Sequence, residues 1–279
     1  MRSCQKPSYN FSEIYDICSS SRVEPIRSQL RLVKEKIEES NGIYEQKMRD
    51  AKPFEITTID ENSILPIKHK DLENLYNDKL VKGAARYIYD EILVKAKSKG
   101  CCFCTHEEPI ELDHYLAKTK FAEFSVNPLN LIPSCHRCNK AKSDYSPSNL
   151  ENSFIHPYFE DMADTLLWLN AKMIYQDNCP VIKYEISEDL DPTQNSRLQF
   201  QFYKLRLNER YSRQAAREIS NREYRFRNIF EERGPEGVRE DLELECEGYF
   251  SKNQNSWQAA LYSCLKNDEY FHSMLWNIL

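Results

Sequence analysis

Two pairs of cysteines constrain what this chain can fold into more than any other feature of its sequence. Each pair has the spacing C-x-x-C, and together they comprise Cys101, Cys104, Cys135 and Cys138. Two such pairs supply four thiolates, the ligand set of a tetrahedral Zn²⁺ site that keeps no open position and serves structure. Zinc bound in this way contributes on the order of 10 kcal/mol to folding. We therefore predict a small module organised around a structural zinc ion, with these four cysteines as its ligands.

The other cysteines follow no comparable pattern. Cys102 is a weaker alternative to Cys101, because only one residue separates it from Cys104. The first residues, MRSCQKPSYN, lack the apolar run of a signal peptide, and no stretch has the ~18 apolar residues of a membrane span. We therefore expect a cytoplasmic protein that does not enter the membrane and has no disulfide framework. The cysteines interpreted as ordinary small side chains are Cys4, Cys18, Cys102, Cys179, Cys246 and Cys264.

The rest of the chain is expected to be mainly helical. Only 6 of the 279 residues are glycine, 41% are hydrophobic, and apolar residues recur at three- and four-residue spacing. The segment 181–187, VIKYEIS, instead alternates apolar and polar residues as a strand does. We predict a mainly α fold with a small α+β insert, divided into a helical region 1–99, a cysteine-rich module 100–160 and a helical region 161–279. Helices are predicted over 25–50, 162–173, 197–230 and 257–279, and over 71–98, where Gly83 weakens the helix.

A second set of polar residues lies between the two cysteine pairs. Apolar and polar residues alternate up to Asp113 and His114, which predicts a strand that ends in a carboxylate and an imidazole. A second short strand is expected over 129–133, and it carries Asn130. The module therefore brings two strands and several polar side chains into one short stretch of sequence.

A short helix is predicted to follow, over 135–143. Asn139 comes one residue after Cys138, so it is turned by about 100° and should face the strands rather than the zinc. Lys142 follows three residues later and should share the face of Asn139. The spacing alone thus predicts two strands, a helix and a cluster of polar side chains between them.

The order C-x-x-C, Asp-His, Asn-Leu, C-x-x-C-Asn and Lys resembles the HNH endonucleases, whose ββα-metal fold cleaves phosphodiester bonds in nucleic acids. The resemblance covers about residues 100–145 and implies a zinc-stapled ββα-metal module flanked by helical regions. It implies that His114 is the general base and that Asn130 holds it in its working orientation. It also implies that Asp113 and Asn139 bind a catalytic Mg²⁺ or Mn²⁺ ion. These roles agree with the chemistry, because neutral imidazole accepts a proton from water and oxygen ligands suit hard cations.

Basic and histidine side chains around this module are the candidates for further contacts. His136 is expected at the surface or on a phosphate, with metal binding as the alternative. His156, in the sequence HPYF, is expected to pack beside its neighbours, with an approach to the active site as the alternative. The candidates for contacts with DNA phosphates are Lys118, Lys120, Arg137, Lys140 and Lys142.

Charge is segregated in the C-terminal region. Residues 204–227 include eight basic and three acidic side chains, whereas residues 231–247 include eight acidic side chains and two arginines. The plainer interpretation is a pair of solvated helix faces. The alternative is a stripe that faces phosphates, followed by a surface for a basic partner.

A narrower resemblance extends from LDHYLAKTKF through the second cysteine pair to HPYF. This longer pattern is similar to the HNH subgroup encoded beside ATPases in bacterial anti-phage systems, such as the nuclease subunit of the Septu-type systems. The resemblance implies an effector nuclease for DNA with an ATPase partner of the SMC or ABC type. The chain itself has no G-x-x-x-x-G-K-[ST] loop, so an ATPase would be another protein. The alternatives are a free-standing HNH nuclease of the restriction or mobile-element type, and a non-catalytic zinc module that binds nucleic acid or a protein.

Overall fold

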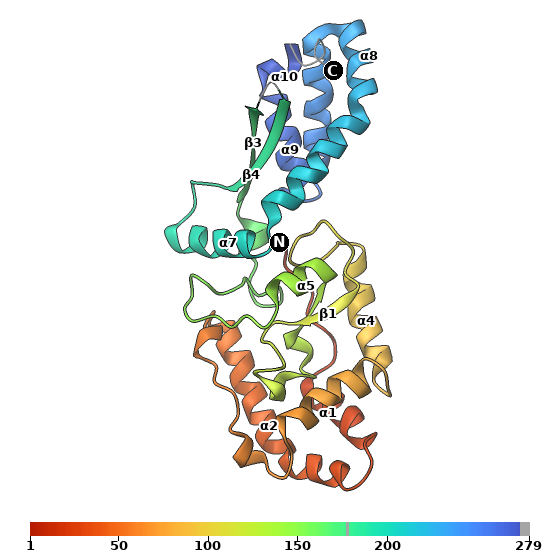
Figure 1. Ribbon diagram of the computed structural model, residues 1–279, viewed down its shortest axis with the longest axis vertical. Coiled ribbons are helices and arrows are strands. Elements are labelled where there is room, and N and C mark those ends of the chain that lie inside the picture. Colours follow the sequence, from red (N-terminus) through yellow and green to blue (C-terminus); the bar gives the residue numbers. More distant parts are fainter. Residues whose placement is uncertain (177–178, 274–279) are drawn as a thin grey trace. The chain divides into compact units, whose positions relative to one another are not determined.

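The computed structural model describes residues 1–176 and 179–273. The chain is mainly helical and contains two small antiparallel sheets (Figure 1). It forms two compact units, Met1–Asp161 and Met162–Leu279. The predicted segments 1–99 and 100–160 therefore lie together in the first unit. Throughout the described residues, no helix is long and apolar enough to cross a membrane.

The N-terminal part of the first unit is built from helices. Helix α1 starts with a capping box, in which the side chain of Asn10 accepts from the backbone N–H of Glu13 and the Glu13 carboxylate accepts from the N–H of Asn10. The amphipathic helix predicted over 25–50 is confirmed by α2. The helices of this part are α1 (Phe11–Ser20), α2 (Ile26–Arg49), α3 (His69–Asn74) and α4 (Arg86–Lys97), with 3₁₀ turns at Pro53–Glu55 and Glu61–Ile64.

The helix predicted over 71–98 is interrupted. It divides into α3, a π-helical turn at Leu75–Leu80, and α4 after a tight bend. At the bend Gly83 lies so close to the preceding turn that a Cβ atom there would be 2.5 Å from the carbonyl oxygen of Asp78. The glycine is therefore required by a close backbone approach, which a helical pattern in sequence does not reveal.

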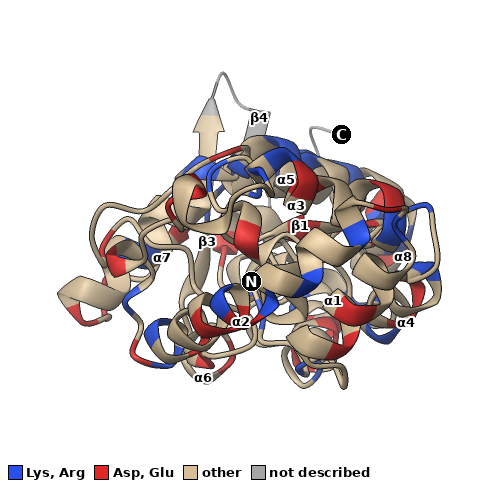
Figure 2. Cartoon of the chain, turned by 90° about the horizontal axis from the view of Figure 1, so that it is seen from below, with Lys and Arg blue, Asp and Glu red and all other residues tan. Residues whose placement is uncertain are grey.

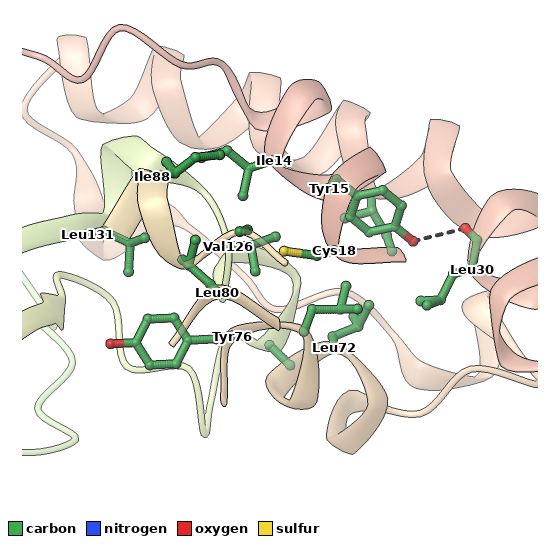
Figure 3. Packing of buried hydrophobic residues seen from close by; sticks show 14 of the residues in the cluster. Ile14, Tyr15, Cys18, Leu30, Leu72, Tyr76, Leu80, Ile88, Val126 and Leu131 are labelled. Carbon is green, nitrogen blue, oxygen red and sulfur yellow. Dashed lines mark hydrogen bonds between the residues drawn. The ribbon is translucent and has the colours of Figure 1, made fainter. Parts of the chain in front are cut away.

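One hydrophobic core joins these helices to the cysteine-rich segment. Figure 3 shows Tyr15, Leu72, Tyr76 and their neighbours packed around this core, where Tyr15 also donates a hydrogen bond of 2.9 Å to a backbone carbonyl of α2. Leu112 and Leu131, from the segment between the cysteine pairs, belong to the same core. Each buried leucine contributes about 2 kcal/mol through the hydrophobic effect. Shared packing is thus the reason that 1–99 and 100–160 form one unit.

Two strands and a helix follow in the predicted order. Strand β1 (Glu111–His114) pairs antiparallel with β2 (Leu131–Ser134), and helix α5 (His136–Lys142) follows directly. The predicted strand ending in Asp113 and His114 is confirmed. Asn130, however, ends a 3₁₀ turn at Pro128–Asn130 and lies just before the second strand rather than within it.

The second unit combines a β-hairpin with helices. The strand predicted at 181–187 is confirmed by β4, and the helical character of 197–230 is confirmed by α7 and α8. Of the helix predicted over 257–279, the described part forms α9 and α10, whereas residues 274–279 lie outside the described residues. The elements are α6 (Met162–Thr165), β3 (Leu169–Gln176), β4 (Cys179–Ile186), α7 (Pro192–Lys204), α8 (Leu207–Phe250), α9 (Trp257–Lys266) and α10 (Glu269–Ser273).

The prediction of a helix over 162–173 is wrong. Only α6 is helical there, and the chain then forms β3, which pairs with β4 from Leu169 opposite Ile186 to Gln176 opposite Cys179. The buried faces of the hairpin carry Leu169, Ile182 and Tyr184. Pairing with a strand farther along the chain overrides the local helical pattern, because it supplies hydrogen-bond partners and a buried face together.

Candidate metal centre and active site

The four predicted zinc ligands lie together. The sulfur atoms of Cys101, Cys104, Cys135 and Cys138 are all within 4.8 Å of one another, and all four side chains are buried. The Sγ atoms of Cys104 and Cys135 are 3.8 Å apart. A tetrahedron of thiolates with Zn–S bonds of ~2.3 Å has edges of about 3.8 Å. The cluster therefore has the ligand type and the size that a metal ion such as zinc requires.

The local backbone builds this cluster from a loop and a helix. Gly100 has φ +76°, and a Cβ atom there would be 2.8 Å from the carbonyl oxygen of Thr105, so the loop closes tightly only with glycine. The backbone N–H of Thr105 in turn donates to the carbonyl of Cys101 at 2.8 Å. On the other side Cys135 is the N-cap of α5, and Cys138 lies in its first turn. Both pairs thus point at one place because short hydrogen-bonded turns hold them.

The interpretation of Cys4 and Cys102 as unpaired residues is wrong, because they form a disulfide. The N-terminal segment lies along the cysteine loop, where the N–H of Arg2 donates to the carbonyl of Cys102 and its guanidinium donates to the carbonyl of Gly100 at 2.7 Å. This contact joins residues far apart in sequence, so spacing gave no sign of it. Cys18, Cys246 and Cys264 are free, as expected, whereas the side chain of Cys179 lies outside the described part of the structure.

His114 is held as a neutral imidazole. Its Nε2 atom is 2.9 Å from the backbone carbonyl of Ser125, which can only accept, so Nε2 carries the proton and Nδ1 has the free lone pair. The edge of the ring packs against Tyr76, with the ring centroids 4.4 Å apart. Burial lowers the pKa of His114 to about 3. The side chain therefore remains a neutral base at physiological pH.

Asp113 is the buried carboxylate of the site. Its Oδ2 atom is 3.3 Å from Nζ of Lys142 and lacks a hydrogen bond within the described structure. Burial raises the pKa of Asp113 to about 6, although the positive charge of Lys142 opposes this shift. A buried carboxylate oxygen with spare coordination capacity, in a cavity that also holds the amide of Asn139, fits a hard divalent cation such as Mg²⁺ or Mn²⁺.

Three of the predicted catalytic residues line one cavity. Asp113, His114 and Asn139 lie around an open cavity of about 630 Å³, together with Lys118. The α3–α4 region supplies the facing wall through Asn74, Tyr76, Asn77, Asp78, Val81, Lys82 and Tyr89. A carboxylate, a neutral imidazole, an amide and a lysine are thus available to one bound group.

Asn130 acts on this site through the chain rather than by touching the imidazole. Its Nδ2 atom donates to the carbonyls of Leu116 at 3.0 Å and Phe124 at 3.3 Å, and its Oδ1 atom accepts from the N–H of Leu116 at 2.8 Å. These bonds tie Leu116 to Phe124, the residue just before Ser125, whose carbonyl orients His114. Asn130 therefore lies one step behind His114 and fixes the backbone that orients it.

A buried polar chain continues behind Asn130. The hydroxyl of Tyr44 lies 3.2 Å from Oδ1 of Asn130 and 3.1 Å from Nε2 of His156. Nδ1 of His156 accepts from the N–H of Tyr158, so its Nε2 donates to Tyr44. The expected packing role of His156 is thus confirmed, and burial lowers its pKa to about 3. Sequence reasoning missed Tyr44, because one tyrosine on a core-facing helix gives no signal of its own.

The candidate phosphate contacts differ in exposure. The prediction that Lys142 contacts a DNA phosphate is contradicted, because its side chain is 1% exposed and its ammonium is directed at Asp113. Lys118 is half-buried in the cavity, where its Nζ donates to Asn77 at 2.7 Å and lies over the ring of Tyr76. Lys120, Arg137 and Lys140 are exposed, and their contacts with DNA phosphates remain predictions. Arg137 also pairs with Glu107.

The charged stretches of the second unit pair with one another. Helix α8 bends at Gly234, which has non-helical φ and ψ values, and its second half runs back along the first (Figure 1). Arg222 then binds Glu245, and Arg225 binds Asp241. Figure 2 shows basic and acidic positions interspersed along the ribbon of α8. This arrangement favours the structural interpretation over a stripe free to face phosphates, because Arg222 and Arg225 are engaged by the acidic stretch.

Comparison with known proteins finds a similarity to a phage protein. The chain is 27% identical over 237 residues to protein Ea31 of Escherichia phage lambda, and the match covers 78% of each chain. No protein-family profile matches the chain, and no solved structure matches it.

Proposed function

We propose that this protein is a metal-dependent endonuclease of the HNH type that hydrolyses phosphodiester bonds in DNA. The observation that carries the proposal is the placement of His114, a neutral imidazole with a free Nδ1, beside Asp113 and Asn139 in one open cavity. This set can provide a base and the ligands of a divalent cation at the same place. A zinc module with a purely structural role would need none of these three residues.

Each side chain has its own role in the proposed reaction. His114 takes a proton from the attacking water through Nδ1, while the Ser125 carbonyl holds the protonated Nε2 in place. Mg²⁺ or Mn²⁺ held by Asp113 and Asn139 would neutralise the charge that develops on the phosphate and the leaving oxygen. Lys118 lines the same cavity, and its ammonium is proposed to bind a phosphate oxygen.

The proposal is tested with supercoiled plasmid and zinc-loaded protein in the presence of Mg²⁺ or Mn²⁺. We expect His114→Ala to lower the cleavage rate at least ~100-fold, the usual effect of losing a general base. His136→Ala is the matched control, because His136 is 69% exposed, bonds to Glu111 and does not line the cavity. Cleavage that survives His114→Ala at an undiminished rate would exclude the assignment. An RNA substrate of the same sequence tests the preference for DNA.

The biological setting is a separate proposal that rests on the narrower sequence resemblance. We propose that the nuclease is the effector of an anti-phage complex with an ATPase partner of the SMC or ABC type. Co-purification of the tagged chain from a host that carries its neighbouring genes tests this setting. Recovery of a stoichiometric ATPase supports it, whereas vigorous plasmid cleavage by a monomer without a partner favours the free-standing alternative.

A further inference from the structure

The proposed reaction leaves one buried charge without a role. Lys142 is 1% exposed, and its Nζ atom lies 3.4 Å from Oδ1 and 3.3 Å from Oδ2 of Asp113. A third oxygen, the carbonyl of Ser143, is 3.5 Å away. The ammonium therefore faces both oxygens of the carboxylate that would bind a divalent cation. A lysine is rarely buried to this extent unless a partner compensates its charge.

The position of Lys142 at the end of α5 brings its ammonium to Asp113. Helix α5 (His136–Lys142) is seven residues long, has Cys135 of the cysteine cluster as its N-cap and ends at Lys142. The C-terminal end of a helix favours a cation. Ser143 then turns the chain away with φ +54°, a conformation that residues other than glycine seldom adopt. Lys142 is thus fixed from both sides, by the metal-binding end of its helix and by the turn that follows it.

We infer that Lys142 is an internal counter-cation that occupies Asp113 in the resting protein, so that a divalent ion binds only when the ammonium withdraws. The inference rests on the proposed role of Asp113 as a metal ligand. Two cations that share one carboxylate at contact distance repel each other, and the repulsion is strong where little water screens it. Lys142 therefore stabilises the empty site and weakens its affinity for the metal. The occupancy of the site by the catalytic metal then stays low until substrate or a partner displaces the lysine.

The test measures Mn²⁺ binding to zinc-loaded protein without DNA, by calorimetry and by electron paramagnetic resonance. We expect Lys142→Met to raise the affinity for Mn²⁺ at least ~10-fold, since it removes the competing charge and keeps the length of the side chain. In the absence of Mn²⁺ this variant should melt at a lower temperature than wild type, because Asp113 loses its partner. Added Mn²⁺ should then raise its melting temperature more than that of wild type.

Controls separate the effect from a general loss of charge. Lys140→Met removes an exposed lysine from the same helix and should leave the affinity for Mn²⁺ unchanged. Asp113→Asn combined with Lys142→Met should abolish the gain. If Lys142→Met does not fold, Lys142→Gln keeps a donor for Asp113 without the charge and should show the same direction of change.

An unchanged or weaker affinity for Mn²⁺ in a folded Lys142 variant overturns the inference. Its failure is distinguishable from failure of the nuclease proposal. Wild-type cleavage that depends on His114, together with no gain in Mn²⁺ affinity, removes the counter-cation and keeps the nuclease. A gain in Mn²⁺ affinity that requires Asp113, together with no cleavage of any substrate by wild type, supports the counter-cation role of Lys142 and rejects the nuclease proposal.

Discussion

At the scale of single residues, burial decides what the histidines do. His114 and His156 are both buried, and burial lowers the pKa of each to about 3. His136, by contrast, is largely exposed on the outer face of α5. The sequence placed His136 at the surface and His156 in packing, but it gave no sign that His114 is buried, as His156 is. Exposure is a property of the assembled core, so residue type and spacing do not determine it.

His156 makes stability depend on pH. The unfolded chain protonates this imidazole at its ordinary pKa near ~6.5, whereas the folded chain does so only at about 3. The unfolded state therefore binds more protons as pH falls below about 6.5, and stability is lost progressively toward pH 3. His156→Gln should remove about 2 kcal/mol of the decrease in unfolding free energy between pH 7 and pH 5. Urea denaturation at pH 7 and at pH 5 measures this difference in unfolding free energy, with His136→Gln as the control. The same decrease between the two pH values in wild type and His156→Gln would refute this account.

At the scale of elements, the bend in the long helix α8 decides which partners its charged side chains have. The chain carries a basic stretch and then an acidic stretch, and each by itself suits a solvated face. The bend at Gly234 folds the second stretch back along the first, where Arg222 pairs with Glu245 and Arg225 with Asp241. Arg222 is the centre of this contact, since it binds Glu218 and Glu245 and lies over the ring of Tyr262.

The pair Arg222–Glu245 should therefore stabilise the second unit. Both side chains are about four-fifths buried, and the guanidinium donates to both carboxylate oxygens. A double-mutant cycle with Arg222→Ala and Glu245→Ala should give a coupling energy of about 1 kcal/mol. Thermal or chemical unfolding measures it. The exposed pair Arg86–Asp90 on α4 is the control and should give less than about 0.5 kcal/mol, so equal coupling in the two cycles would contradict the assignment.

At the scale of the whole molecule, stabilising devices are unevenly distributed. The cysteine cluster and the Cys4–Cys102 disulfide both lie in the first unit. The second unit has its own buried core, which includes Trp168, Tyr211 and Leu261. The two units should consequently respond differently to loss of a metal, because metal binding contributes to folding only where the ligands are.

Removal of zinc should loosen the first unit and leave the second folded. A strong chelator should expose backbone amides in 100–142 to hydrogen exchange, while protection in 192–266 stays as before. Zinc content by elemental analysis should fall from one ion per chain to none, and Cys138→Ser should have the same effect as the chelator. Equal loss of protection in both segments, or a native protein without zinc, would contradict this expectation.

The sequence by itself determined the features that are local. Two C-x-x-C pairs, the strand that ends in Asp113 and His114, and the helix at the second pair depend on spacing within a few residues, and the structure has all of them. Side-chain periodicity and the geometry of tight turns are enough to specify such features. Even the grouping of Asp113 with Asn139 in one cavity follows from the order of two strands and a helix.

Only the tertiary structure decided the partners of these residues. The Cys4–Cys102 disulfide, the pairing of β3 with β4, and the burial of Lys142 against Asp113 all join segments that are separated along the chain. Contacts of this kind form when packing brings the segments together, and the free energy of burial then selects among partners that look equivalent in sequence. The chemistry available at the site was therefore readable from the residues, whereas its electrostatic state, with a lysine seated on the proposed metal ligand, required the assembled fold.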